Sequence, residues 1–208
     1  METSSPVLVL FAQSLLIGLS IAAPVGQIGV LAIQRTLDHG RAAGLATGLG
    51  AAFADAVYGA IGAFGVTGLI AWLLEAKLWL GLFGAAFLLY LAWSIATKPP
   101  VSRGTGHAPP GTLLRFVSGT FVLTLSNPTT ILSFIAVFGA LAGRAPAASP
   151  WAMVSGVLIG SALWWLVLAG IVGLLRDRFD ERWQRAVNWC SASLLAGLAL
   201  WQLAQLLD

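Results

Sequence analysis

Charged side chains are scarce in this sequence. Asp, Glu, Lys and Arg make up only 9% of its 208 residues, whereas 58% of the residues are hydrophobic. A soluble domain usually carries about 25% charged residues, so this chain cannot supply the polar surface that water requires. Lipid must therefore be the solvent for much of its surface. The composition predicts an integral membrane protein.

Residues that form disulfides or bind transition metals are equally few. Cys190 is the single cysteine, which excludes an intramolecular disulfide and any site built from several cysteines. The two histidines, His39 and His107, fall in expected loops without neighbouring metal ligands. No nucleophile–base pair can be assembled from such residues. We therefore expect no metal, no cofactor and no enzymatic activity.

Long apolar segments recur along the chain. A helix needs about 20 apolar residues to cross the hydrocarbon core of a bilayer, and a helix satisfies its backbone hydrogen bonds internally. The sequence therefore predicts an all-α membrane protein. We expect six transmembrane helices, over residues 7–33, 43–70, 74–97, 113–142, 151–175 and 184–207.

Basic residues indicate how these helices are oriented. Nine of the eleven Lys and Arg residues fall in the loops after the first, third and fifth helices, and we assign Arg35 and Arg41 to the first of these loops. The opposite side has only Lys77 and Arg144. Because basic loops stay in the cytoplasm, both termini are expected outside it. This bias also explains the net charge of +3 without a nucleic-acid partner.

The six helices divide into two halves of three within a single transmembrane domain, 1–208. The halves are residues 1–97 and 113–208, joined by a Pro- and Gly-rich cytoplasmic linker over 98–112. Since three is an odd number, the second half begins on the side where the first half ended. Related halves would therefore be inverted repeats, an architecture that many transporters have.

Two of the expected helices are interrupted at corresponding positions, near the midplane. The first contains AAPVGQ at residues 22–27 and the fourth contains SNPTT at residues 126–130. Proline inside a helix removes one backbone hydrogen bond. A mild kink without a ligand would explain a single proline, whereas paired breaks indicate a transporter site. We therefore predict binding residues at both breaks: Pro24, Gly26, Gln27, Asn127, Pro128 and Thr129.

Glycine pairs are expected to pack the second and fifth helices closely against their neighbours. Gly44 and Gly48 lie in the second helix, and Gly156 and Gly160 lie in the fifth. Small residues four positions apart let two helix backbones approach each other. We interpret both pairs as packing sites rather than as binding residues.

Asp55 is the only acidic residue in the long apolar run between Arg41 and Glu75. A charged side chain there costs about 2.5–3.5 kcal/mol on insertion scales. Its role could be structural, as a hydrogen-bond partner at a break or as a permanently protonated carboxyl. We favour a functional role, in which a proton, a cation or a substrate amine neutralises it. Trp164 and Trp165 lie away from the expected helix ends, and a tryptophan face there could hold such an amine by a cation–π contact. We name Trp164 as the candidate, although lipid-facing packing fits either tryptophan equally well.

The same segments resemble a known family, the LysE superfamily of amino-acid exporters. The resemblance extends over the whole chain and is carried by LSIAAPVGQIGVLAIQRTLDHGRAAGLATGLGAAFADAVYG, SNPTTILSFIAVFG and SALWWLVLAG. Members usually have Gly-Pro where this chain has Gly26 and Gln27, so Gln27 adds an amide. The resemblance implies a bacterial inner-membrane protein that exports amino acids or related small metabolites, driven by the proton motive force.

The resulting hypothesis is a secondary transporter. Amides after Pro24 and Pro128 would receive the substrate carboxylate at half-helix N-termini. Asp55 would hold the substrate ammonium in one state and a proton in the other, and a homodimer is compatible with this arrangement. Two alternatives stay open. One is a membrane assembly or chaperone subunit in which Asp55 only pins two helices, and the other is a metal-ion exporter, against which the lack of a second intramembrane carboxylate argues.

Overall fold

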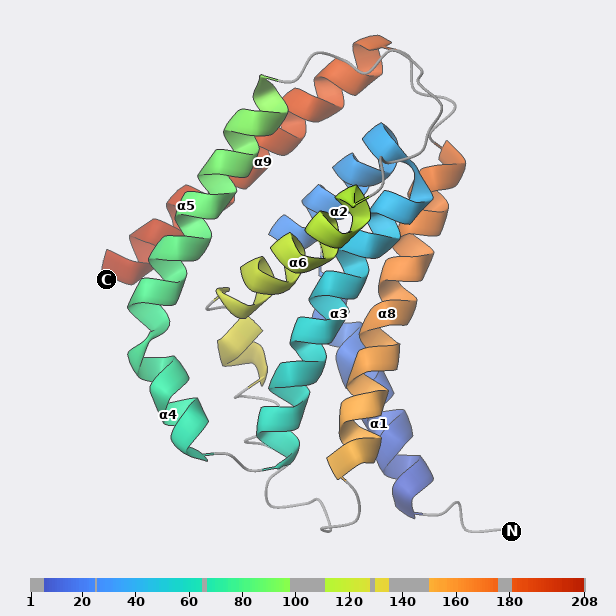
Figure 1. Cartoon of the computed structure of the whole chain (residues 1–208), viewed down its shortest axis with the longest axis vertical. Helices are drawn as coiled ribbons and strands as arrows, with labels where there is room; N and C mark the ends of the chain where they lie inside the picture. The colour runs from blue at the N-terminus through green and yellow to red at the C-terminus, as the bar shows by residue number, and fades with distance from the viewer. Residues whose placement is uncertain are drawn as a thin grey trace.

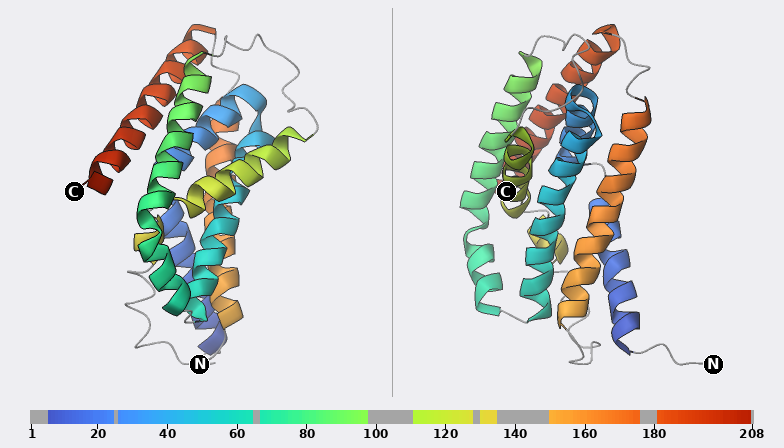
Figure 2. Two further views of the ribbon diagram at one scale, coloured as in Figure 1. Left: turned by 60° about the vertical axis from the view of Figure 1, so that its left-hand side comes forward. Right: turned by 45° about the vertical axis from the view of Figure 1, so that its right-hand side comes forward.

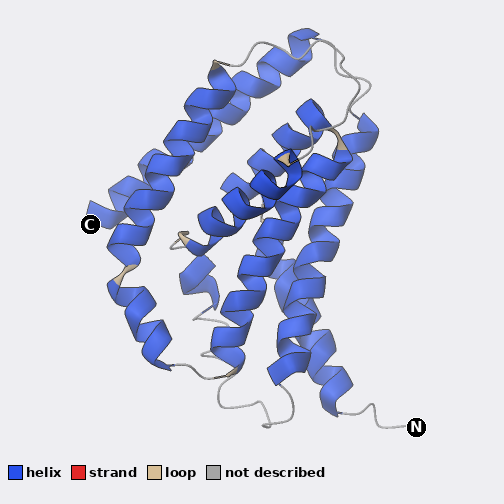
Figure 3. Cartoon of the chain, viewed as in Figure 1, coloured by secondary structure: helices blue, strands red, loops and turns tan. Residues whose placement is uncertain are grey.

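The computed structural model of the chain describes residues 6–24, 26–64, 67–97, 111–127, 130–134, 150–175 and 181–207, which form helices joined by short turns. Within these ranges no strand occurs (Figure 3). The helices are α1 (Pro6–Ala22), α2 (Gln27–His39), α3 (Arg41–Ala63), α4 (Thr67–Glu75), α5 (Lys77–Ala96), α6 (Thr112–Leu125), α8 (Pro150–Leu175) and α9 (Glu181–Leu207). A short helical segment over residues 130–134 follows α6. The all-α prediction is confirmed.

Four helical segments are long and apolar enough to cross a membrane: α3, α5, α8 and Arg185–Ala204 of α9. A fifth crossing results if α1 and α2 count as one bent span, because their axes differ by 77° across a short break. The expected fourth helix, 113–142, corresponds to α6 and residues 130–134, and its remainder lies outside the described residues. The described residues thus contain four candidate membrane crossings, or five with the bent pair.

The boundary expected for the first loop was wrong. The helix expected to end at residue 33 continues to His39 and stops only at Gly40, whose φ of 86° favours glycine. Arg35 and His39 therefore belong to α2 and not to a loop. The second expected helix is also shorter than predicted, because α3 ends at Ala63 and α4 is a separate helix.

The helix ends are sorted between the two ends of the bundle. Figures 1 and 2 show the α2–α3 turn, the last turn of α5, the first turn of α9 and the last turn of α8 toward the upper end. The first turns of α1 and α8, the last turn of α3 and all of α4 lie toward the lower end. We call the upper end the α2–α3 end. The connections to which most basic residues were assigned therefore leave from one end.

The helices pack as a larger group with a helix pair at its side. α3 packs against α2, α6 and α8, and α1 packs against α8. The helix pair consists of α5 and α9, in which the Gln202 amide donates a hydrogen bond to the Gly81 carbonyl at 2.8 Å. α2 contacts α9 as well as α3 and α8, so it lies between the two groups.

Glycines bring α1, α3 and α8 into close contact. A Cβ atom added at Gly160 would collide with the carbonyl group of Leu15, and one added at Gly18 would collide with the backbone of Val157. Gly48 of α3 lies against the side chain of Trp165 in the same manner. The packing role predicted for the glycine pairs is confirmed, since larger residues would separate these helices.

The outer surface is apolar. Trp79 and Trp93 of α5 are 73% and 72% exposed, and Trp151 of α8 is 70% exposed. Exposed apolar area of this extent is unfavourable in water, but it suits a surface that faces lipid, where tryptophan gathers at the bilayer boundaries. The surface therefore agrees with the membrane location that the composition predicts.

The contact between α1 and α8 makes Gly160→Ala a destabilising substitution. We expect the free energy of unfolding to fall by about 1–3 kcal/mol, because the added methyl group forces α1 away from α8. Gly170→Ala is the matched control, since a Cβ at that position of the same helix meets nothing within 4 Å. It should be neutral or slightly stabilising. Thermal unfolding in one detergent compares the two, and equal melting temperatures would contradict the close packing.

Candidate functional site

A cavity of about 190 Å³ lies where both helix breaks meet. Sites for drug-sized ligands measure roughly 300–1,000 Å³, so this cavity suits a smaller molecule. Its wall is partly apolar and partly polar, and it comes from α1, α2, α3, α6, α8 and residues 130–134. The lining residues are Ile21, Ala22, Pro24, Gly26, Gln27, Ile28, Gly29, Ala51, Asp55, Thr124, Asn127, Thr130, Ser133 and Trp165.

The first turn of α2 forms one wall of the cavity. The first bond of this helix runs from the Val30 amide to the Gly26 carbonyl at 3.1 Å, so the amides of residues 27–29 precede the first helical partner. Gly26 has an extended backbone, and no side chain caps the helix. Uncapped amides at the positive end of a helix dipole attract anions. This wall can therefore receive a carboxylate.

Asp55 supplies an acidic group to another part of the cavity wall, where a cation rather than an anion would be attracted. Its side chain is 4% exposed, and its Oδ2 accepts a 2.7 Å hydrogen bond from the Ser161 hydroxyl. Ser161 in turn accepts a 3.2 Å hydrogen bond from the Trp165 indole. Because the serine oxygen accepts from Trp165, its own hydrogen is directed to the carboxyl group. Among the described residues, none donates to the other oxygen, Oδ1, which can therefore receive a proton or an ammonium group.

Thr124 adds a hydroxyl group to the cavity near the second break. The residue is 3% exposed, and its Oγ1 has no hydrogen-bond partner among the described residues. A buried hydroxyl without a partner costs about 1–3 kcal/mol. Thr124 is therefore a group that a polar ligand in the cavity would satisfy.

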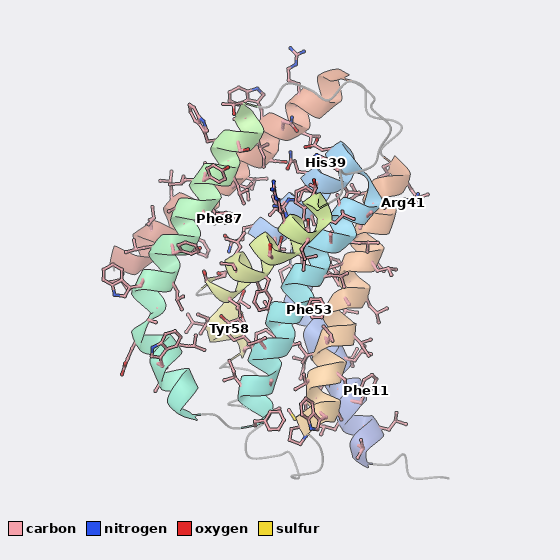
Figure 4. All side chains as sticks on the ribbon, viewed as in Figure 1. Phe11, His39, Arg41, Phe53, Tyr58 and Phe87 are labelled. Atoms are coloured by element: carbon pink, nitrogen blue, oxygen red, sulfur yellow. The ribbon has the colours of Figure 1, made fainter. Side chains whose placement is uncertain are left out.

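Tyr58 supports the second break from the side of α3, one turn beyond Asp55 (Figure 4). Its hydroxyl donates a 2.6 Å hydrogen bond to the carbonyl of Leu125, the last residue of α6. Its ring stacks on Phe134 with 5.6 Å between the centroids. This carbonyl belongs to the last turn of α6, and the last carbonyls of a helix need partners from outside the helix.

The predicted site residues are only partly brought together. Trp164 is not among the lining residues. It is only partly buried at the edge of the apolar core, whereas its neighbour Trp165 is buried within that core and lines the cavity. Adjacent helical residues point about 100° apart, so only one of the two can do so. Pro128 and Thr129 lie outside the described residues. The predicted residues that line the cavity are Pro24, Gly26, Gln27, Asp55 and Asn127.

Ser161 and Thr124 were not predicted from the sequence, and of the two neighbouring tryptophans considered, Trp164 rather than Trp165 was named as the site residue. Ser161 and Trp165 are four residues apart and so share one face of α8. That spacing, beside an acidic residue on a glycine-rich partner helix, is a signal that could have identified them. Thr124 has no such signal, because a threonine four residues before a proline break is unremarkable in a membrane helix.

Comparison with known proteins decides the family. The sequence profile of the LysE type translocator family matches residues 19–205. The chain belongs to the LysE type translocator family. The predicted resemblance is therefore confirmed, and membership indicates a transport protein, in agreement with the prediction that it is not an enzyme. No solved structure matches this LysE type translocator.

Two relatives of this translocator are similar over most of its length. "Uncharacterized membrane protein YahN" of Escherichia coli (strain K12) is 31% identical over 172 residues, which cover 81% of this chain and 77% of that protein. "Putative amino acid efflux protein YcgF" of Bacillus subtilis (strain 168) is 28% identical over 186 residues, which cover 86% of this chain and 88% of that protein.

Thr124→Val should leave this LysE type translocator as stable as the wild type, or stabilise it by up to about 1 kcal/mol, because it removes a buried hydroxyl that has no described partner. Thr120→Val, one turn earlier in α6, is the matched comparison. Thr120 accepts a 3.0 Å hydrogen bond from Arg35, so its loss should cost about 1–3 kcal/mol. Unfolding in one detergent measures both variants. Equal losses would show that the Thr124 hydroxyl already has a partner.

Proposed function

We propose that this protein is a secondary transporter that exports amino acids or related small metabolites from the cytoplasm in exchange for protons. One observation carries the proposal: a carboxyl group and an uncapped helix N-terminus line the same small cavity. An amino acid presents an ammonium and a carboxylate group, which are the complements of these two walls. The relative named for amino acid efflux supports the same substrate class.

In this proposal each wall holds one end of the substrate. The amides of residues 27–29 bind the carboxylate, as helix N-termini bind anions. Asp55 binds the ammonium group through Oδ1, while Ser161 fixes the orientation of the carboxyl group through Oδ2. The Trp165 ring lines the same cavity and can contribute a cation–π contact. Thr124 and Asn127 supply further polar groups at the second break.

Proton exchange follows from the single charge of Asp55. The residue is buried, and it forms no ion pair with a Lys or Arg among the described residues. Its carboxylate therefore needs either a proton or the substrate ammonium as its neutralising partner, and it cannot hold both. Release of the substrate outside leaves Asp55 to be protonated there, and loss of that proton to the cytoplasm prepares it for the next substrate.

The proposed architecture is the six-helix domain, 1–208, with inverted repeats over 1–97 and 113–208 and a linker over 98–112. Two helix breaks, one from each half, contribute to one cavity, which is the arrangement that inverted repeats produce. We place the α2–α3 end in the cytoplasm and the chain in the inner membrane of a bacterium, with both termini outside. A homodimer is compatible with the apolar outer faces of α5 and α8.

A purely structural role for Asp55 is the competing interpretation, and a specific contact favours it. The hydrogen bond from Ser161 to Asp55 joins α8 to α3, so the acid could serve only to pin these helices together. That role would fit an assembly or chaperone subunit. The two interpretations differ in what loss of the charge does to folding and to transport.

Asp55→Asn should give a folded protein without transport. The amide oxygen still accepts from Ser161, so the contact between α3 and α8 persists, but the side chain can no longer be protonated or attract an ammonium group. Efflux from bacteria loaded with dipeptides measures transport at matched membrane abundance. Ser161→Ala is the control, because it removes the contact and keeps the acid, and it should retain slower efflux. Normal efflux by Asp55→Asn, or unfolding of both variants, would contradict the proposal.

Proton coupling has its own test. Inside-out membrane vesicles expose the cytoplasmic end of the transporter, so transport into them corresponds to export. Acidifying the vesicle interior should accelerate uptake of an exported amino acid severalfold, because protons leaving the interior drive the exchange. A protonophore should abolish the acceleration and leave slow downhill transport. An uptake rate that neither the acidified interior nor the protonophore changes would exclude proton antiport.

A further inference from the structure

Arg35 is a buried cation that the proposed exchange does not use. Its side chain, in α2, is 8% exposed. One guanidinium nitrogen donates hydrogen bonds to the hydroxyls of Thr47 in α3, at 3.1 Å, and of Thr120 in α6, at 3.0 Å. The guanidinium carbon lies 4.3 Å from the ring centre of Phe116. Among the described residues no Asp or Glu pairs with Arg35, so its charge is held by two hydroxyls and an aromatic face.

The Arg35 guanidinium lies next to the cavity, at a level of the bundle that we call the layer and that Arg35, Thr47 and Thr120 define. Thr47 precedes the lining residue Ala51 by four residues, and Thr120 precedes the lining residue Thr124 by four. Each acceptor is therefore one helical turn, about 5.4 Å, from the cavity wall. In both helices that turn leads toward the α2–α3 end, which the proposed orientation places in the cytoplasm (Figure 1). Arg35 thus bridges α2, α3 and α6 between the cavity and the cytoplasm.

The partners of Arg35 are weak for a buried charge. Two hydroxyl dipoles compensate a desolvated cation less well than a carboxylate does, because they leave its net charge unneutralised, whereas buried charges are normally paired with an opposite charge. A guanidinium can also grip a carboxylate with two parallel hydrogen bonds. A carboxylate that arrives in this layer would therefore displace the threonines. Asp55 cannot do so from its own position, since it lies two helical turns beyond Thr47 in α3.

We propose that Arg35 captures the carboxylate of the substrate on its way from the cytoplasm into the cavity, and that this capture opens the layer. When the guanidinium turns to the substrate, it releases Thr47 and Thr120, so α2 loses its hydrogen bonds to α3 and α6 at this level. The inference rests on the proposed export function and refines it: the exported molecule must carry a free carboxylate. An amide or ester of the same amino acid has the ammonium group but nothing for Arg35 to bind.

Uptake into inside-out membrane vesicles tests the inference. The common amino acids, each labelled with carbon-14, are supplied singly to the wild type, and the amide of any that is transported is then used as a competitor. The amide should compete at least about tenfold more weakly than the unlabelled acid, as for a site that lacks its hydrogen-bond partner. Arg35→Gln should weaken this discrimination and leave only the part that the amides of residues 27–29 supply. Arg35→Lys should weaken it less, because it retains the charge without the planar fork.

Thr120→Val distinguishes capture from a purely structural role. It removes one of the groups that compete with the substrate for Arg35, so KM should fall by about fivefold, the worth of one hydrogen bond. Thr36→Val is the matched control. Thr36 is a buried α2 residue whose hydroxyl donates to the Ala32 carbonyl and not to Arg35, so this variant should leave KM unchanged.

The outcomes separate this inference from the function on which it rests. No transport of any amino acid by the wild type would overturn the proposed function and the capture step with it. Transport by the wild type with an unchanged KM in Thr120→Val, or with full discrimination against the amide in Arg35→Gln, would overturn the capture step alone. If Arg35→Gln does not reach the membrane, the comparison of Thr120→Val with Thr36→Val decides.

Discussion

The hydrogen bond between Ser161 and Asp55 is the contact on which the site depends. It joins α3 to α8 at a depth where an unpaired carboxyl group would be costly, and it fixes which oxygen of that group faces the cavity. The bond requires α3 and α8 to approach closely, and Gly48 permits this because Trp165 lies directly against it. The same indole then donates to Ser161. The close packing of α3 against α8 and the hydrogen bonds that lead to Asp55 therefore depend on the same tryptophan.

The helix breaks show how the chain provides hydrogen-bond partners for backbone groups, which lipid cannot supply. At the end of α6 the Leu125 carbonyl obtains one from Tyr58, a side chain of another helix. At the start of α2 the free amides face a cavity. Irregular backbone is tolerated at membrane depth only where protein or a polar cavity surrounds it. Within the described residues no side chain caps the start of α2, so its first amides are left to the cavity.

Much of this arrangement follows from the sequence, and the exceptions have physical reasons. Asp55, Gln27 and Asn127 could be predicted because polar residues are rare in lipid-facing segments and must serve a purpose. Trp165 could not be chosen over Trp164, because α8 is apolar all round and its pattern does not define an inner face. Arg35 resembled a loop residue, since a basic residue near the end of an apolar run usually marks the membrane boundary. Only the contacts with Thr47 and Thr120 show that it is buried.

The glycine contacts also tie three helices into one packed unit. With no side chain between their backbones, α1 and α8 cannot separate without opening a void, and α3 is packed closely against α8 at Gly48. The α5–α9 pair is a second unit. Since α2 contacts both units and follows the break at Pro24, a relative displacement of the two units would pass through the helix that carries the uncapped amides and Arg35.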